Sequence, residues 1–158
     1  FGKYKLNTLE PFAKYEIDNL KVTPILSSHY GYGVNEVGFN YIITRQDGKT
    51  FLYAADTGWY WKSTWDYFKT VKLKLDFVVI ECTYGNYNLP AKQEGHLNIP
   101  NMLEMIETMN GIGMLSHGTP VYLTHICHLH TLNHKKTLDL FKECAWNIQV
   151  GYDGMKTV

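Results

Sequence analysis

Four histidines lie within ten residues of this chain, directly after a short apolar segment that is typical of a buried strand. The segment covers residues 121–123, and the histidines are His125, His128, His130 and His134. Neutral imidazole is the commonest protein ligand for transition metals. A loop after one strand cannot aim every imidazole at a single ion, so we expect one or two of the four to be ligands. Their spacing matches no zinc-finger pattern, and a separate structural zinc site is therefore not favoured.

Histidines and carboxylates also follow other predicted strands. Four of these strands have such a residue at the carboxyl end, namely His29, Asp56, Glu81 and His125. Any one of them, taken singly, is better explained as a turn or loop residue, or as a core histidine whose hydrogen bonds are satisfied. Together they form a pattern, because turns chosen independently would more often carry Asn, Ser or Gly. Since α/β enzymes build their sites at the carboxyl ends of strands, these residues are candidates for one shared site.

The periodicity of apolar residues predicts the elements that must position these side chains. Hairpins, followed by alternating strands and helices, indicate one mixed α/β domain. The expected strands cover residues 15–17, 20–26, 39–44, 50–55, 77–80 and 121–123, followed by a β-like tail over 148–156. The expected helices cover residues 61–72, 100–109 and 133–145, with Pro100 at the first helical position of the second and Asn133 as N-cap of the third.

Composition indicates a globular chain. Its 158 residues, 45% hydrophobic and 15% aromatic, are enough for one domain with a core and argue against disorder. Lys plus Arg and Asp plus Glu number 15 each, so no net field attracts nucleic acid or anionic lipid. No stretch is apolar enough to cross a bilayer. The three cysteines, Cys82, Cys127 and Cys144, lack metal-ligand or redox spacing and are interpreted as reduced core thiols of a cytoplasmic protein.

Seven short motifs follow one another in order along most of the chain, from about Leu9 to its last residues. They are Leu20-Lys21-Val22-Thr23-Pro24 leading to His29, Gly38-Phe39-Asn40-Tyr41-Ile42, Tyr53-Ala54-Ala55-Asp56-Thr57-Gly58, Glu81-Cys82-Thr83-Tyr84, Gly95-His96, Leu123-Thr124-His125-Ile126-Cys127-His128 and Gly151-Tyr152-Asp153-Gly154-Met155. This ordered set resembles the metallo-β-lactamase-fold hydrolases, most closely the PhnP-type phosphodiesterases and more distantly the RNase Z enzymes that process tRNA 3′ ends. The resemblance implies the C-terminal half of an αββα sandwich, in which a mixed sheet with β-hairpins carries two to three flanking helices.

The resemblance also implies a site with two divalent cations, zinc or manganese. His29 and His125 would be terminal ligands of different ions, and Asp56 would bridge the two with one carboxylate oxygen on each. Imidazole and carboxylate ligands suit either metal. The family's signature His-x-His-x-Asp-His motif, which supplies other ligands of both ions, does not occur in this sequence.

The place of that motif in the family would be before Phe1. We therefore expect residues 1–158 to form a single partial domain, inactive alone, that an N-terminal half completes. Such a half-domain would expose a sheet face that the other half buries. A degenerate relative that binds no metal is the alternative interpretation, and a homodimer also stays open.

For catalysis, the resemblance implies hydrolysis of a small or cyclic phosphodiester by a hydroxide that bridges the two ions. His96, oriented by Glu81, would donate a proton to the leaving alkoxide or contact the phosphate. His128 would lie beside the site and contact the substrate or the ligands. Two alternatives stay open, an RNase Z-like tRNA 3′-end endonuclease and a non-catalytic domain that binds a partner chain. A thioester or lactone substrate is also compatible with the fold.

Overall fold

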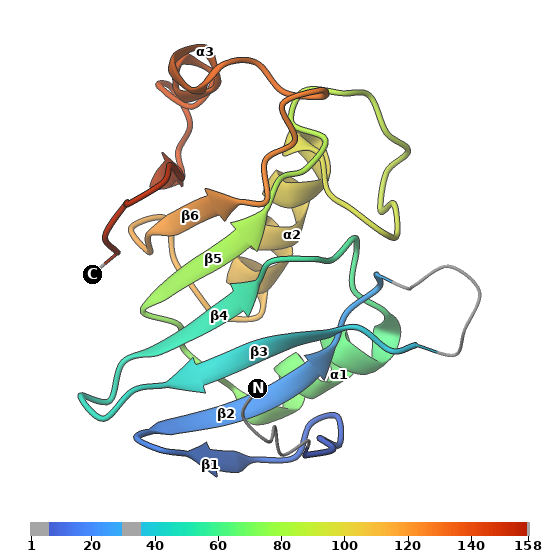
Figure 1. Cartoon of the computed structure of the whole chain (residues 1–158), viewed down its shortest axis with the longest axis vertical. Helices are drawn as coiled ribbons and strands as arrows, with labels where there is room; N and C mark the ends of the chain where they lie inside the picture. Colours follow the sequence, from blue (N-terminus) through green and yellow to red (C-terminus); the bar gives the residue numbers. More distant parts are fainter. Residues whose placement is uncertain (1–6, 30–35, 158) are drawn as a thin grey trace, which may run out of the picture.

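Seven strands form one mixed sheet in which the spatial order of the strands is their order along the chain. The computed structural model describes residues 7–29 and 36–157, which contain all of these elements (Figure 1). Neighbours from β1 to β4 are antiparallel, and neighbours from β4 to β7 are parallel. The predicted mixed α/β architecture is confirmed. The strands are β1 (Tyr15–Ile17), β2 (Leu20–Leu26), β3 (Phe39–Thr44), β4 (Thr50–Ala54), β5 (Phe77–Glu81), β6 (Val121–Thr124) and β7 (Ile148–Val150).

Two tight turns close the predicted hairpins. Asp18 and Asn19 join β1 to β2, and Asp18 adopts a left-handed φ of 50°, which aspartate tolerates better than most residues. Between β3 and β4, Gly48 has a φ of 84°, and its N–H donates to the carbonyl oxygen of Arg45 at 3.0 Å. The N–H of Arg45 in turn donates to the carbonyl oxygen of Lys49 at 2.9 Å. These local contacts set the register of each hairpin.

Two helices cover one face of the sheet. They are α1 (Lys62–Val71) and α2 (Ile99–Gly111), and Figure 1 shows both behind the strands. The side chain of Asn98 caps α2 by accepting a hydrogen bond from the N–H of Asn101 at 2.9 Å. Pro100 lies in the first turn, one position later than the sequence predicts, where a missing N–H costs no helical hydrogen bond. The sequence therefore specifies the start of α2 to within one residue.

The core lies between the sheet and these two helices. Buried positions alternate along β4 and recur at every third or fourth position on α2, whereas β5 and β6 are apolar almost throughout. The sheet and the helices therefore present apolar faces to each other. Packing of these faces holds the strands in place and thereby fixes the strand ends that carry the candidate site. The fully buried residues include Ile25, Leu52, Val78 and Ile80 from the strands and Phe68, Met102, Met105, Ile106 and Met109 from the helices.

The third helix is shorter than the sequence predicts. The expected interval was 133–145, whereas α3 covers only His134–Asp139. Asn133 is the N-cap as expected, because its side chain accepts a main-chain N–H. Beyond the helix, the N–H groups of Leu140 and Phe141 donate to carbonyl oxygens three residues back, so the chain continues in tight turns instead of an α-helix. Of the β-like tail predicted over residues 148–156, only β7 (Ile148–Val150) forms a strand.

The three cysteines are free thiols in the described chain. Cys82 is buried, and its burial, assisted by the charge of Glu81, raises the pKa of its thiol to about 12. It is therefore a protonated core thiol, whereas Cys127 and Cys144 are half-buried. Within residues 7–29 and 36–157, none of the helices is long and apolar enough to span a bilayer. A cytoplasmic location stays a prediction.

Candidate metal centre

One edge of the sheet collects the four residues that the sequence predicts to share a site. β3 runs in the opposite direction between β2 and β4, so β2 ends at the same edge as β4, β5 and β6 (Figure 1). His29, Asp56 and His125 follow the ends of three of these strands, and Glu81 is the last residue of β5. His96 reaches the same place from the loop between β5 and α2.

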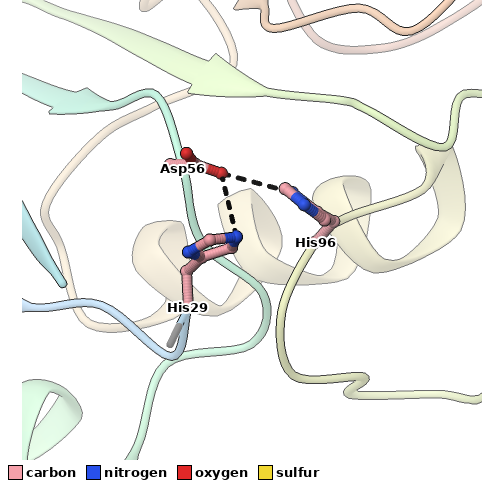
Figure 2. A group of neighbouring side chains, drawn as sticks. All are labelled: His29, Asp56 and His96. Atoms are coloured by element: carbon pink, nitrogen blue, oxygen red, sulfur yellow. Dashed lines mark ion pairs between the residues drawn. The ribbon is translucent and has the colours of Figure 1, made fainter. Parts of the chain in front are cut away.

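Asp56 lies at the centre of the group. Its Oδ1 atom lies 3.6 Å from Nε2 of His29 and 3.4 Å from Nδ1 of His96, and both rings point toward it in Figure 2. Its Oδ2 atom lies 3.9 Å from Nε2 of His125. The two carboxylate oxygens thus face different histidines.

The Oδ1 atom of Asp56 is buried and has no hydrogen-bond partner among the described residues, although the side chain as a whole is 46% exposed. A buried carboxylate oxygen without a partner is costly, because it has lost its hydration without compensation. A cation placed between Oδ1 and the neighbouring imidazole nitrogen atoms would remove that cost. The donor set therefore fits a divalent metal ion.

Three polar side chains hold the main chain at Asp56. The hydroxyl of Ser27 donates to its carbonyl oxygen at 2.6 Å, and the amide of Asn40 donates to the same oxygen at 3.3 Å. The hydroxyl of Tyr60 donates to Oδ1 of Asn40 at 2.8 Å. Burial, with the charge of Glu81, raises the pKa of Tyr60 well above its ordinary value, so the hydroxyl keeps the proton that it donates. This network fixes the position from which the carboxylate projects.

Glu81 is a buried carboxylate whose charge is fully hydrogen-bonded. Its side chain has no solvent exposure. The main-chain N–H groups of Thr57, Thr83 and Leu97 donate to it at 2.7, 3.2 and 3.1 Å. Nδ1 of His96 lies 2.9 Å from its Oε1 atom. Four donors from three parts of the chain compensate for the lost hydration, which a buried charge requires.

The carboxylate of Glu81 changes the pKa of His96. The hydrogen bond to Glu81 raises the pKa of the imidazole, partial burial opposes the shift, and the charges of Glu81 and Asp56 raise it further. A larger fraction of His96 is therefore protonated near neutral pH than of a free histidine. Because Nδ1 is committed to Glu81, Nε2 is the atom that can exchange a proton with a substrate.

A glycine allows the His96 loop to approach the Asp56 loop. A Cβ atom at Gly58 would lie only 2.5 Å from main-chain atoms of Gln93, Glu94 and Gly95. The N–H of Trp59 also donates to the carbonyl oxygen of Gln93 at 2.8 Å. Close main-chain packing at residues 93–95 thus places the histidine that follows them.

His125 is held by a threonine on the neighbouring strand end. Its Nδ1 atom lies 2.7 Å from Oγ1 of Thr83, and the same hydroxyl donates to the main-chain carbonyl oxygen of His125 at 2.9 Å. His125 has a φ of 52°, in the left-handed region, where histidine occurs more often than most residues other than glycine. The two contacts from Thr83 hold both the ring and the main chain of this residue.

The other histidines of the cluster lie elsewhere. His128 is exposed, and no hydrogen bond, ion pair or ring contact joins it to the group around Asp56 in the described chain. The ring of His130 lies 4.9 Å from that of Tyr84. His134 begins α3, and its Nε2 atom lies 3.1 Å from the carbonyl oxygen of Val150. The predicted contact of His128 with the site stays a prediction.

Five residues of the site had no role predicted from the sequence. Thr57 and Thr83 lie inside the motifs that carry the family resemblance, so those motifs already contained the signal for them. Ser27, Asn40 and Tyr60 act on Asp56 from 29, 16 and 4 residues away, through single hydrogen bonds or a chain of two. Asn40 also lies inside one of these motifs, Gly38-Phe39-Asn40-Tyr41-Ile42, whereas nothing in the sequence distinguishes Ser27 and Tyr60 from other polar residues.

Among the residues that the structure describes, two overlapping groups of side chains could hold a metal ion. One consists of His29, Asp56 and His96, and the other of Glu81, His96 and His125, and within each group the ligand atoms lie within 4.8 Å of one another. Imidazole with carboxylate suits zinc and manganese alike. Both groups contain His96, whose Nδ1 is hydrogen-bonded to Glu81, and Glu81 already accepts four hydrogen bonds. His29, Asp56 and His125 are therefore the better candidates for ligands.

Comparisons with known proteins identify the fold. No protein-family model and no curated protein matches the sequence. The metallo-β-lactamase fold protein YhfI from Bacillus subtilis is similar in structure, with a TM-score of 0.66 and 16% identity over 97% of this chain and 57% of YhfI. Yeast PDE1 has a TM-score of 0.62 and 16% identity over 90% of this chain and 46% of PDE1. A CmlA β-hydroxylase variant has a TM-score of 0.58 and 13% identity over 91% and 32% of the two chains.

The predicted metallo-β-lactamase fold is confirmed by these similarities. The chain spans about half the length of the first two structures. One of the three proteins is named as a β-hydroxylase, so the shared fold does not fix the reaction. The PhnP or RNase Z branch and the assignment to the C-terminal half stay predictions.

Proposed function

We propose that this chain, with its metallo-β-lactamase fold, forms part of a metal-dependent hydrolase that cleaves a phosphodiester. The observation that carries the proposal is that the two carboxylate oxygen atoms of Asp56 face different histidines. Its Oδ1 atom faces His29 and has no hydrogen-bond partner in the described chain, and its Oδ2 atom faces His125. This is the arrangement that a carboxylate bridging two cations requires.

His29 and one oxygen of Asp56 would hold one divalent ion, zinc or manganese, and His125 and the other oxygen would hold the second. Two such ions lower the pKa of a water to near neutrality and offset the charge of phosphoryl oxygens. Three side chains do not fill the coordination shells of two ions. We therefore propose that polypeptide outside these 158 residues, such as an N-terminal half with a His-x-His-x-Asp-His motif, supplies the other ligands.

His96 would protonate the departing oxygen. The buried Glu81 holds its ring by Nδ1 and favours the protonated form, which leaves Nε2 to deliver a proton. A positioned acid of this kind matters most when the leaving group is a poor one, such as an alkoxide. The substrate that fits this pairing of acid and metal ions is a phosphodiester with an alkyl leaving group.

A small or cyclic phosphodiester is favoured over tRNA. The chain has no net charge, and binding to a phosphate backbone requires an excess of basic residues. Hydrolysis of precursor tRNA with a steep dependence on salt would support the endonuclease alternative instead.

The test is hydrolysis of bis(p-nitrophenyl) phosphate and of a cyclic nucleotide by the intact protein with Mn²⁺ or Zn²⁺. We expect Asp56→Ala and His125→Ala to abolish turnover. His117→Ala is the matched control, because His117 packs on Trp146 with ring centroids 4.1 Å apart and has no contact with the Asp56 group. Unchanged turnover in the Asp56 or His125 variant would show that the assignment is wrong. A metal content well below one ion per chain would favour a non-catalytic, partner-binding role.

A further inference from the structure

The hydrogen bonds of Thr83 determine which nitrogen of His125 carries the proton. A carbonyl oxygen can only accept, so the 2.9 Å contact between Oγ1 of Thr83 and the carbonyl oxygen of His125 uses the single hydroxyl proton of Thr83. The 2.7 Å contact between the same Oγ1 atom and Nδ1 of His125 must then have the imidazole as donor. In the neutral ring, a proton on Nδ1 leaves a free lone pair on Nε2.

That lone pair faces a carboxylate oxygen. Nε2 of His125 lies 3.9 Å from Oδ2 of Asp56. Two atoms with lone pairs that face each other repel, and the repulsion becomes an attraction when a cation lies between them. The tautomer set by Thr83 is thus the one that makes Nε2 a metal ligand.

We propose that Thr83 is a positioning residue that prepares His125 for metal binding, by fixing its tautomer and its main chain. This inference rests on the metal site of the proposed function, but the state of the metal-free imidazole can be tested without any activity. Histidine ligands commonly donate their second ring N–H to a fixed acceptor, and loss of that acceptor weakens metal binding. Here the acceptor is a hydroxyl that is anchored in turn on the histidine's own carbonyl oxygen.

The surroundings of Thr83 make its role difficult to replace. The residue is only 8% exposed, so water has little access to take over a lost hydroxyl. Its N–H donates to the buried carboxylate of Glu81, and its carbonyl oxygen accepts from the N–H of Cys127 at 3.3 Å. The main chain of Thr83 is therefore fixed from both sides, and the hydroxyl has a defined position. The segment from Glu81 to Thr83 orients His96 at one end and His125 at the other.

The first experiment is a long-range ¹H–¹⁵N NMR correlation of the imidazoles in the intact, metal-free protein, at a pH where His125 is neutral. We expect wild type to show the proton of His125 on Nδ1. In Thr83→Val, which keeps the shape of the side chain and removes the hydroxyl, we expect that preference to be lost. Thr83→Ser retains the hydroxyl and should retain the tautomer.

The second experiment is a titration of the same variants with Zn²⁺ and Mn²⁺ by calorimetry. Loss of the acceptor is expected to weaken binding about 10- to 100-fold in Thr83→Val, and Thr83→Ser should bind within a few-fold of wild type. Thr119→Val is the matched control, since Thr119 is also a buried, hydrogen-bonded threonine but precedes β6 at the opposite edge of the sheet.

A wild-type His125 with its proton on Nε2, or a Thr83→Val variant with unchanged tautomer and affinity, would overturn the proposal. If Thr83→Val fails to fold, a proton on Nε2 of His125 in the wild-type spectrum would still overturn the proposal. The two proposals can fail separately. An Nδ1 proton that depends on Thr83, found in a protein without hydrolase activity, would support the role of Thr83 and contradict the proposed function.

Discussion

The Nδ1 atom of His96 lies 2.9 Å from the Oε1 atom of Glu81, a carboxylate with no exposure to solvent. Three main-chain N–H groups hold the same carboxylate, so it cannot turn away without leaving several buried groups unpaired. The orientation of the His96 ring is therefore fixed before any substrate binds. Such preorganisation is what an acid at a reacting centre needs.

Substitution of His96 should distinguish good from poor leaving groups. We expect His96→Ala to lower turnover of a cyclic nucleotide or a dialkyl phosphodiester about 10²- to 10⁴-fold, the usual contribution of a general acid. The loss with bis(p-nitrophenyl) phosphate should be much smaller, because p-nitrophenolate leaves without a proton. Steady-state kinetics with both substrates measures the difference. Equal losses with both would indicate that His96 is a ligand or a substrate contact instead.

Removal of the Glu81 charge should lower the pKa of His96. The hydrogen bond to Glu81 is the largest cause of the raised value, so Glu81→Gln is expected to return the imidazole toward or below its ordinary value of 6.5. NMR titration of the metal-free protein measures the shift. Glu104→Gln is the control, because Glu104 is a half-exposed residue of α2 that pairs with Lys92 at 3.4 Å.

The same shift has a consequence for stability. A folded-state pKa above 6.5 means that protonation of His96 stabilises the folded protein. That contribution is complete below a pH of about 6.5 and is lost as the pH rises through the raised folded-state value. Urea unfolding of wild type and Glu81→Gln across this range should show a smaller pH dependence in the variant, where only the charge of Asp56 still raises the pKa of His96. A dependence of the same size in both would contradict the Glu81–His96 pairing as its source.

The two carboxylate oxygen atoms of Asp56 predict the stoichiometry of metal binding. Oδ1 faces His29 and Oδ2 faces His125, so His29→Ala and His125→Ala should each lose one of two ions. Asp56→Asn should weaken both sites, because it removes the negative charge that offsets two adjacent cations. Metal content of the intact protein, by mass spectrometry of the purified variants, gives the count. His134→Ala should keep both ions, since its ring contacts the main chain at Val150.

Gly58→Ala should displace the loop that carries His96. A Cβ atom there would overlap main-chain atoms of residues 93–95 at 2.5 Å, and main chain cannot yield as the end of a flexible side chain can. We expect a loss of about 1–3 kcal/mol in the free energy of unfolding, typical of overpacking, together with reduced turnover. Denaturant unfolding measures the first effect. Gly118→Ala is the control, because no described residue other than its two chain neighbours lies within 4 Å of its added Cβ, and both effects should be absent there.

The helix layer should be as important to stability as the sheet. Phe68 on α1 has no solvent exposure and packs edge-on against Tyr60 and Trp65 at 5.6 and 5.8 Å between ring centroids. Phe68→Ala should lower the free energy of unfolding by about 3–5 kcal/mol. Val71→Ala at the 37% exposed end of the same helix is the control and should cost far less. Equal effects, measured by urea unfolding, would show that α1 does not pack as described.

The sequence predicts most of the local structure of this protein, because local structure depends mainly on residues that are close together in the sequence. Short apolar runs separated by turn residues indicated the strands and both hairpins, and Pro100 indicated the start of α2 to within one residue. The error at α3 has a matching cause. The apolar spacing beyond Asp139 is compatible with a helix, but the tight turns at Leu140 and Phe141 form instead.

The candidate site likewise has a part that local sequence determines and a part that it does not. The sequence by itself determined that His29, Asp56, Glu81 and His125 stand at strand ends, because strand limits follow from periodicity. Only the tertiary structure decided the contacts among them, such as which histidine each carboxylate oxygen of Asp56 faces. The contacts of Asp56 with His29 and His125 join residues that are 27 and 69 positions apart in the sequence. Helix packing and main-chain contacts set the distances between such residues, and no local pattern in the sequence encodes them.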